Sequence, residues 1–310
     1  MGTRMTFLGM GNMGKAISQN LVTKGNLDQP LILWNRTHSI SIIHAEAIGG
    51  SVAVDSVQEA VTKSDIIWSC LADQEAVASV FDTILKMDIK QKVFVECSTM
   101  TPQATTDLCH SVIQRGGEFV AMPVFGEPGL ARAGKLICAP AGKALSIARI
   151  NPYLKGVICR DVINLSDEKP AKASLLKNVG NVLILTTMET VSECHVLAEK
   201  SGLRVEIFQD LLQSMFPIGP HSIYSRGLSS GRYFREQPIV NIDSALSLSA
   251  HISSNAERLG VSLKAYDVTR EHLRKAKKYA GGNGDILGIY GAVRLESGLP
   301  YELNDHNPDV

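Results

Sequence analysis

The sequence predicts an α/β protein in which a doubly wound parallel sheet precedes an all-helical domain, with one long helix joining them. Three observations predict this arrangement. In the first half, short apolar runs alternate with amphipathic stretches, as in parallel βαβ units. Residues 7–14 read FLGMGNMG, a glycine turn between an apolar run and a helical stretch. Beyond about residue 165, helix-forming residues dominate. We therefore expect domains at 1–165 and 166–310.

Short apolar runs mark the expected strands, and amphipathic segments mark the helices between them. The strands are expected at residues 5–8, 31–34, 66–71, 93–96, 118–122 and 136–139. The helices of this half are expected at 15–24, 57–62, 75–85 and 102–115. In an open parallel sheet, ligands bind at the carboxyl ends of the strands, so those ends are where functional residues are expected.

The second half reads as helices alone. Residues 172–202 hold no proline and are interrupted only by Gly180, and Gly202 follows Lys200 as a helix terminator. This segment predicts the long interdomain helix. Further helices are expected at 206–216, 244–259 and 262–280, and the polar tail at 304–310 is expected to fray.

Composition is typical of a soluble globular enzyme. The 31 basic and 31 acidic residues balance, so net charge gives no reason to expect nucleic acid or an anionic membrane as a partner. No apolar run approaches the 18 residues of a membrane span. Six scattered cysteines without a C-x-x-C pair predict neither metal nor disulfide, and they favour a reduced, cytoplasmic location.

The glycine turn has the pattern G-x-G-x-x-G, with glycines at Gly9, Gly11 and Gly14. Gly9 permits the tight turn, Gly11 lets the backbone approach phosphates, and Gly14 lets helix and strand pack closely. Together with a helix N-terminus this predicts a dinucleotide pyrophosphate site. The alternative is a tight turn without a ligand. The predicted contacts are Gly9, Met10, Gly11, Asn12, Met13 and Gly14.

The end of the second strand predicts the nucleotide. An acidic residue at this position would bind the ribose 2′-hydroxyl and select NAD. Here Asn35, Arg36 and Thr37 follow the strand. A guanidinium pairs with a 2′-phosphate, so the sequence favours NADP. The alternative is that Arg36 is a solvated surface charge.

Four segments together resemble the β-hydroxyacid dehydrogenase family, which includes 3-hydroxyisobutyrate dehydrogenase, tartronate semialdehyde reductase and glyoxylate/succinic semialdehyde reductases. They are the glycine turn, ECSTMTP at 96–102, PVFGEPGLARAGKL at 123–136 and LKNVGN at 176–181. The resemblance covers nearly the whole chain. It implies a Rossmann domain of the 6-phosphogluconate dehydrogenase type, an NADP-dependent oxidoreductase acting on CH–OH groups, a small carbonyl or hydroxyacid substrate and a homodimer.

The resemblance also implies roles for individual residues. Lys177 is similar to the family's general acid/base, and Asn181, one helical turn further, to the residue that helps hold the substrate. A protonated lysine suits this reaction because hydride transfer to a carbonyl builds negative charge on oxygen. The alternative is a surface lysine. The implied substrate contacts are Ser98, Val124, Phe125 and Gly126, and the further cofactor contacts are Ser98, Thr99, Leu71, Ala72 and Asp73.

Two of these assignments carry alternatives. Asp73 is expected to cap the following helix with its side chain, leaving cofactor contact to its backbone. Phe125 is either a ligand contact or a packing residue.

This sequence also departs from the family pattern. Phe125 stands in place of a serine and Glu127 in place of a glycine, so a larger or less polar substrate becomes plausible. Ser247 and Leu248 replace the family's Lys-Asp pair, and His251 lies one turn further along that helix. The substrate and the physiological direction therefore stay open.

Two other functions fit parts of the sequence. Imine reductases and reductive aminases resemble this fold and its N-R-T turn but typically lack the lysine, so Lys177 argues against that class. Phe125 and the missing Lys-Asp pair argue mildly for it. A non-catalytic NADP-binding interaction protein is the third possibility, and retention of Lys177 argues against it.

Overall fold

The computed structural model describes residues 2–217 and 219–303, so the tail expected to fray at 304–310 lies outside the described residues. The chain forms two compact units, residues 1–177 and 178–310. The boundary between the two units falls inside helix α8 (Ala171–Lys200), past the boundary at residue 165 that the composition predicts.

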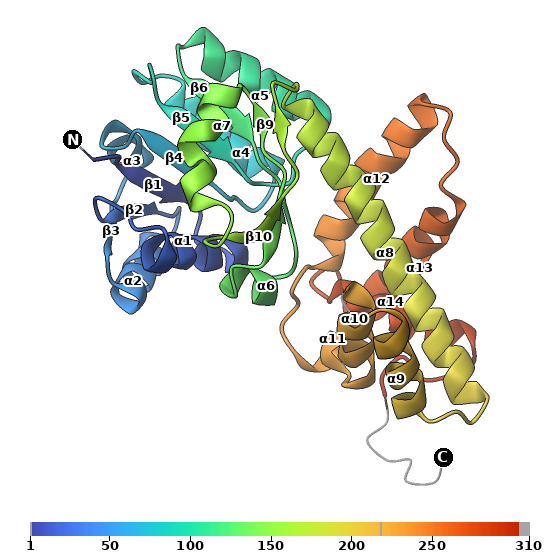
Figure 1. Ribbon diagram of the computed structural model, residues 1–310. Coiled ribbons are helices and arrows are strands. Elements are labelled where there is room, and N and C mark those ends of the chain that lie inside the picture. The colour runs from blue at the N-terminus through green and yellow to red at the C-terminus, as the bar shows by residue number, and fades with distance from the viewer. Residues whose placement is uncertain (1, 218, 304–310) are drawn as a thin grey trace. The chain divides into compact units, whose positions relative to one another are not determined.

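The first unit is built on an eight-stranded sheet with the order β11-β9-β6-β5-β4-β1-β2-β3 (Figure 1). Every neighbouring pair is parallel except β6 and β9. The doubly wound sheet is thereby confirmed. Its strands are β1 (Met5–Leu8), β2 (Leu31–Trp34), β3 (Ser51–Ala53), β4 (Ile66–Ser69), β5 (Val93–Glu96), β6 (Glu118–Ala121), β9 (Ala141–Gly142) and β11 (Leu165–Ser166).

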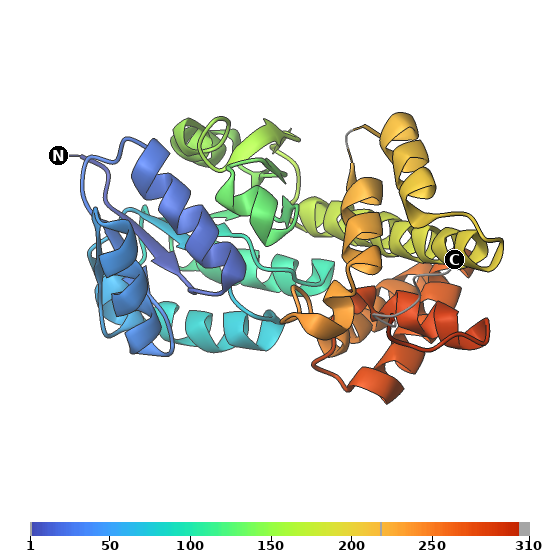
Figure 2. The same cartoon turned by 90° about the horizontal axis from the view of Figure 1, so that it is seen from below.

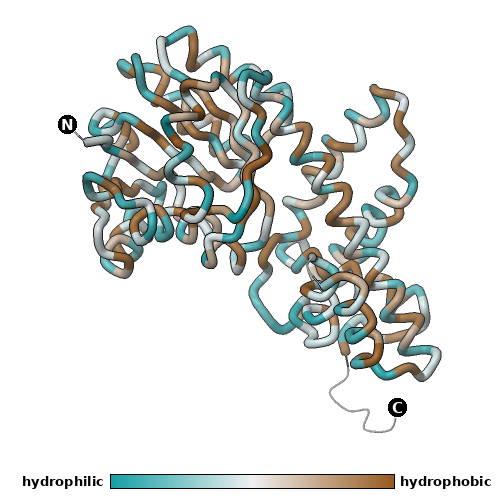
Figure 3. The backbone as a smooth tube through the Cα atoms, in the orientation of Figure 1, coloured by the Kyte–Doolittle hydropathy of each residue, from teal (hydrophilic) through white to brown (hydrophobic). Residues whose placement is uncertain are grey.

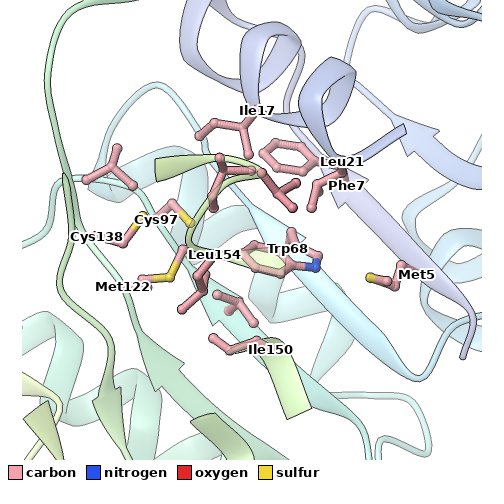
Figure 4. Packing of buried hydrophobic residues seen from close by; sticks show 14 of the residues in the cluster. Met5, Phe7, Ile17, Leu21, Trp68, Cys97, Met122, Cys138, Ile150 and Leu154 are labelled. Atoms are coloured by element: carbon pink, nitrogen blue, oxygen red, sulfur yellow. The ribbon is translucent and has the colours of Figure 1, made fainter. Parts of the chain in front are cut away.

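Both faces of this sheet are covered, which explains why every residue of its central strands β1, β4 and β5 is buried and most of these residues are apolar. In β1, Phe7 belongs to the core on one face and Leu8 to the core on the other. Figure 4 shows Phe7 and Trp68 in the first core, with Ile17 on one side and Ile150 on the other. The helices of this unit are α1 (Asn12–Lys24), α2 (His38–Ile48), α3 (Val57–Thr62), α4 (Gln74–Ile84), α5 (Pro102–Gln114), α6 (Pro128–Arg132) and α7 (Ala144–Ile150).

A second sheet of three strands holds part of the predicted substrate loop. Its order is β10-β8-β7, with β7 (Val124–Phe125), β8 (Leu136–Cys138) and β10 (Cys159–Val162). The strand expected at 136–139 therefore forms as β8, but in this sheet rather than in the main one. The antiparallel pair β7–β8 sets Phe125 opposite Ile137 and fixes the loop backbone.

The second unit contains helices and no strand within 178–217 and 219–303 (Figure 2). Helix α8 runs through Gly180 without interruption, so this glycine does not break it. A core including Leu228, Tyr266 and Leu273 holds the unit together, and polar and apolar positions alternate along its helices (Figure 3). The other helices are α9 (Val205–Met215), α10 (Pro220–Ser229), α11 (Arg232–Arg235), α12 (Ile242–Arg258), α13 (Lys264–Ala280) and α14 (Ile289–Glu296).

None of the helices in the described part of the chain is long and apolar enough to cross a membrane.

Candidate active site

The three glycines of the first turn have different surroundings. A Cβ on Gly9, whose φ is +98°, would lie 2.4 Å from the carbonyl oxygen of Cys70, and one on Gly14 would lie 1.9 Å from that of Gly9. A Cβ on Gly11 would meet nothing within 4 Å. Gly9 and Gly14 are therefore required by the turn itself, while Gly11 borders open space.

That open space lies at the N-terminus of α1. The helix begins at Asn12, three residues before the predicted start, and Gly11 caps it without any side-chain hydrogen bond. The first-turn N–H groups of such a helix point outward with a partial positive charge. An anion such as a dinucleotide pyrophosphate fits this arrangement, and a side chain at position 11 would intrude on it.

The Asn35 side chain hydrogen-bonds the backbone on both sides and so stabilises the glycine turn. Its Oδ1 accepts a hydrogen bond from the Met10 N–H at 3.0 Å, and its Nδ2 donates to the Thr37 carbonyl at 3.0 Å. Arg36 is exposed and makes no hydrogen bond or ion pair with any residue that the structure describes. Asn35 thus positions the turn, and the Arg36 guanidinium is the group available to a ligand phosphate.

A buried carboxylate joins the loops that follow β4 and β5. The Glu96 carboxylate accepts hydrogen bonds from the Ser69 hydroxyl and the Ser98 N–H, both at 2.6 Å. Ser98 Oγ in turn accepts from the Leu71 N–H at 2.8 Å. Burial raises the pKa of Glu96, while the hydrogen bonds from Ser69 and Ser98 oppose that shift. This positioning role is not predictable from the motif alone, and its one signal in the sequence is an acid two residues before Ser98.

Asp73 caps α4 as expected, since its carboxylate accepts the Ala76 N–H at 2.8 Å. Ala72 is exposed beside it and Thr99 is partly exposed, so the two loop backbones are open at the carboxyl edge of the sheet.

Lys177 lies in the first turns of α8 and reaches the predicted substrate loop. Its Nζ donates to the Val124 carbonyl at 2.8 Å and sits 4.9 Å from the centre of the Phe125 ring. The side chain is half-buried, and burial lowers the pKa of Lys177 to about 8. Such a lysine exchanges its proton near neutral pH, as a general acid or base must.

The start of α8 belongs to the first unit, where the hydroxyls of Ser174 and Thr105 lie 2.7 Å apart. Asn181 follows Lys177 by one helical turn and is partly exposed. In the second unit, Ser247 and His251 are exposed on α12 and Leu248 is partly buried in its core. The side chains of Ser247 and His251 make no hydrogen bond with any of the described residues.

The sheet and the glycine turn define an NAD(P)-binding Rossmann domain, the class of domain found in NAD(P)-dependent oxidoreductases. Residues 4–160 match the family model for the NAD binding domain of 6-phosphogluconate dehydrogenase. The chain belongs to the β-hydroxyacid dehydrogenase family.

Known proteins resemble the chain over most of its length. The NADH-dependent oxidoreductase ucdB of Aspergillus ustus is 42% identical over 289 residues, covering 93% of this chain and 98% of that protein. A 3-hydroxyisobutyrate dehydrogenase from Salmonella typhimurium superimposes with a TM-score of 0.81 at 16% identity, covering 93% and 99% of the two chains. A reductive aminase from Aspergillus terreus in complex with NADPH and ethyl levulinate gives 0.60 at 18% identity, covering 93% and 98%.

Proposed function

We propose that the protein is an NADPH-dependent reductase that transfers hydride to the carbonyl of a small β-hydroxyacid-type substrate, a semialdehyde or keto acid, and can run in reverse. The observation that carries this proposal is Lys177, a half-buried ammonium with a pKa of about 8 on the Val124 carbonyl. When bound, the nicotinamide supplies the hydride.

The chain's own residues have distinct tasks in this reaction. The N-terminus of α1 and the open side of Gly11 hold the pyrophosphate. Lys177 uses one N–H on Val124 and directs the others at the substrate carbonyl oxygen, to which it gives a proton as hydride arrives on carbon. Asn181 helps hold the substrate. Val124, Phe125 and Gly126 line its site, and Ser98 shapes that site through the loops it joins.

The choice of NADPH over NADH rests on Arg36. No acidic side chain stands at 35–37 to bind a ribose 2′-hydroxyl, and the exposed guanidinium matches a 2′-phosphate. The Aspergillus ustus relative carries NADH in its name, so the preference requires a direct test.

A substrate panel with the two nucleotides side by side tests the proposal. We expect NADPH oxidation with succinic semialdehyde or another small aldehyde, and kcat/KM for NADPH at least tenfold above that for NADH. Arg36→Ala is expected to raise the KM for NADPH while leaving that for NADH within twofold. Lys63→Ala, which removes a surface cation at the residue after α3, is the matched control. Equal use of both nucleotides by the native protein would overturn the preference.

The second candidate is imine reduction or reductive amination. The turn of Asn35, Arg36 and Thr37 and the presence of Phe125 support this class. Lys177 argues against it, because an iminium is reduced without a strong proton donor at oxygen. Turnover of a cyclic imine with no turnover of any aldehyde would replace the first proposal by this one. A protein that binds NADPH and turns over neither class would be the non-catalytic interaction protein.

A further inference from the structure

The loop beneath Lys177 is nearly devoid of polar side chains. Residues 120–131 read VAMPVFGEPGLA, in which Glu127 is the single polar side chain and is an acid. Pro123 and Pro128 also lack backbone N–H groups. The next cation along the chain is Arg132, on the helix α6 that packs against α1.

Among the predicted substrate contacts at 98 and 124–126, Ser98 alone has a polar side chain, and its hydroxyl is already hydrogen-bonded within the protein. It accepts the Leu71 N–H at 2.8 Å and hydrogen-bonds the buried Glu96 carboxylate. Turning this O–H toward a ligand would remove one of the three donors to the buried Glu96 carboxylate, which also accepts from the Ser69 hydroxyl and the Ser98 N–H, and this loss costs free energy.

Phe125 is therefore the largest side chain that this loop offers to a ligand. Its ring is partly exposed, and Gly126 beside it is exposed. The Lys177 ammonium lies over the ring at 4.9 Å, and the β7–β8 pairing fixes its backbone. The ring is thus held in place beside the proton donor rather than folded into the core.

A substrate carboxylate fits this surface poorly. An anion against the Phe125 ring loses hydration that no cationic or hydroxyl side chain of residues 120–131 replaces, and the Glu127 carboxylate adds repulsion. If the carboxylate bound the Lys177 ammonium instead, it would take the N–H groups needed by the reacting oxygen. It would also hold the proton that has to be transferred.

We propose that Phe125 determines specificity: the substrate packs an apolar, planar group on this ring next to its reacting carbonyl and presents no carboxylate to the 124–127 loop. This inference rests on the proposed reductase function and changes its preferred substrate from a carboxylate-bearing semialdehyde or keto acid, which becomes a poorer substrate, to an uncharged carbonyl compound. Aromatic surfaces favour stacked or edge-to-face partners, so an aryl group satisfies the ring better than a methyl group does.

Binding of unreactive ligands tests this separately from turnover. Protein loaded with NADP⁺ is titrated calorimetrically with 3-phenylpropanamide and with 3-phenylpropanoate, which differ in charge and not in size. The amide is expected to bind at least tenfold more tightly than the acid. Phe125→Leu should keep this preference within threefold because its surface stays apolar, and Phe125→Ser should abolish it. Unchanged melting temperature and NADP⁺ affinity show that the variants fold.

Turnover supplies the second arm. Native kcat/KM for 3-phenylpropanal and for the methyl ester of succinic semialdehyde is expected to exceed that for succinic semialdehyde at least tenfold. The specificity proposal is overturned if the acid binds as well as the amide, if neither ligand binds at millimolar concentration, or if the free semialdehyde is preferred. If the amide preference is present and no aldehyde is reduced, the reductase function fails and the ligand preference stands.

Discussion

At the scale of single residues, the properties of Lys177 follow from its neighbours. Its ammonium has one carbonyl partner, Val124, and an aromatic ring beside it, and no carboxylate forms an ion pair with it among the residues that the structure describes. Burial without a counter-ion disfavours the charged form, which lowers the pKa of the lysine to about 8.

In the proposed mechanism, the pKa of Lys177 sets the pH dependence of catalysis. Reduction needs the protonated lysine, so its kcat is expected to be level below pH 7 and to fall about tenfold per unit above pH 8. Oxidation needs the neutral amine, so its kcat should rise over the same range. Steady-state rates from pH 6 to 10, in both directions at saturating nucleotide, measure this. Parallel profiles in the two directions would contradict the assignment.

At the scale of elements, different glycines of the β1–α1 turn serve the stability of the fold and the binding of the cofactor. A Cβ on Gly14 would lie 1.9 Å from the Gly9 carbonyl oxygen, whereas a Cβ on Gly11 would have no atom within 4 Å. The same substitution at the two positions therefore has different consequences.

Gly14→Ala is expected to lower the free energy of unfolding by about 3 kcal/mol, because the turn must open to admit the methyl group. Gly11→Ala should fold with native stability and bind NADPH at least tenfold more weakly, because its methyl group occupies the phosphate's approach. Urea unfolding and fluorescence titration with NADPH give the two readouts. Normal NADPH affinity in Gly11→Ala would remove the pyrophosphate from this turn.

Whether a strand can be predicted from the sequence depends on its length and on its burial. Strands such as β1 and β5 are predictable because both sheet faces are covered, so three of the four residues in each strand are apolar. β9 and β11 have two residues each, too few for any period, and they were missed. The same holds for the site. Lys177 and the glycine turn are sequence-local motifs, whereas the Glu96–Ser98–Leu71 network depends on two strands being adjacent in space.

At the scale of the whole molecule, each unit has its own core, and the second carries apolar residues that this core does not cover. On α8, Val179 and Leu183 are 66% and 65% exposed, one turn apart. On α9, Ile207, Leu211 and Met215 follow at the same spacing and are 45–60% exposed. Such rows of exposed apolar side chains mark protein interfaces. We propose that they form the contact of a homodimer.

Light scattering coupled to gel filtration tests the dimer. The native protein is expected at about twice the mass of one chain, and Leu183→Glu together with Leu211→Glu should shift it to the monomer. Leu145→Glu, at an 82% exposed position on α7, is the control and should leave the dimer intact. A native protein that elutes as a monomer at micromolar concentration would contradict the proposal.

The central claim is that Lys177 supplies the proton that accompanies hydride transfer. The most direct measurement is the single-turnover rate of NADPH oxidation at pH 7 in Lys177→Met, which keeps the length of the side chain and removes its charge. We expect a loss of at least about 100-fold, with the affinity for NADPH within twofold of native. A rate within threefold of the native protein would show that the proton comes from elsewhere.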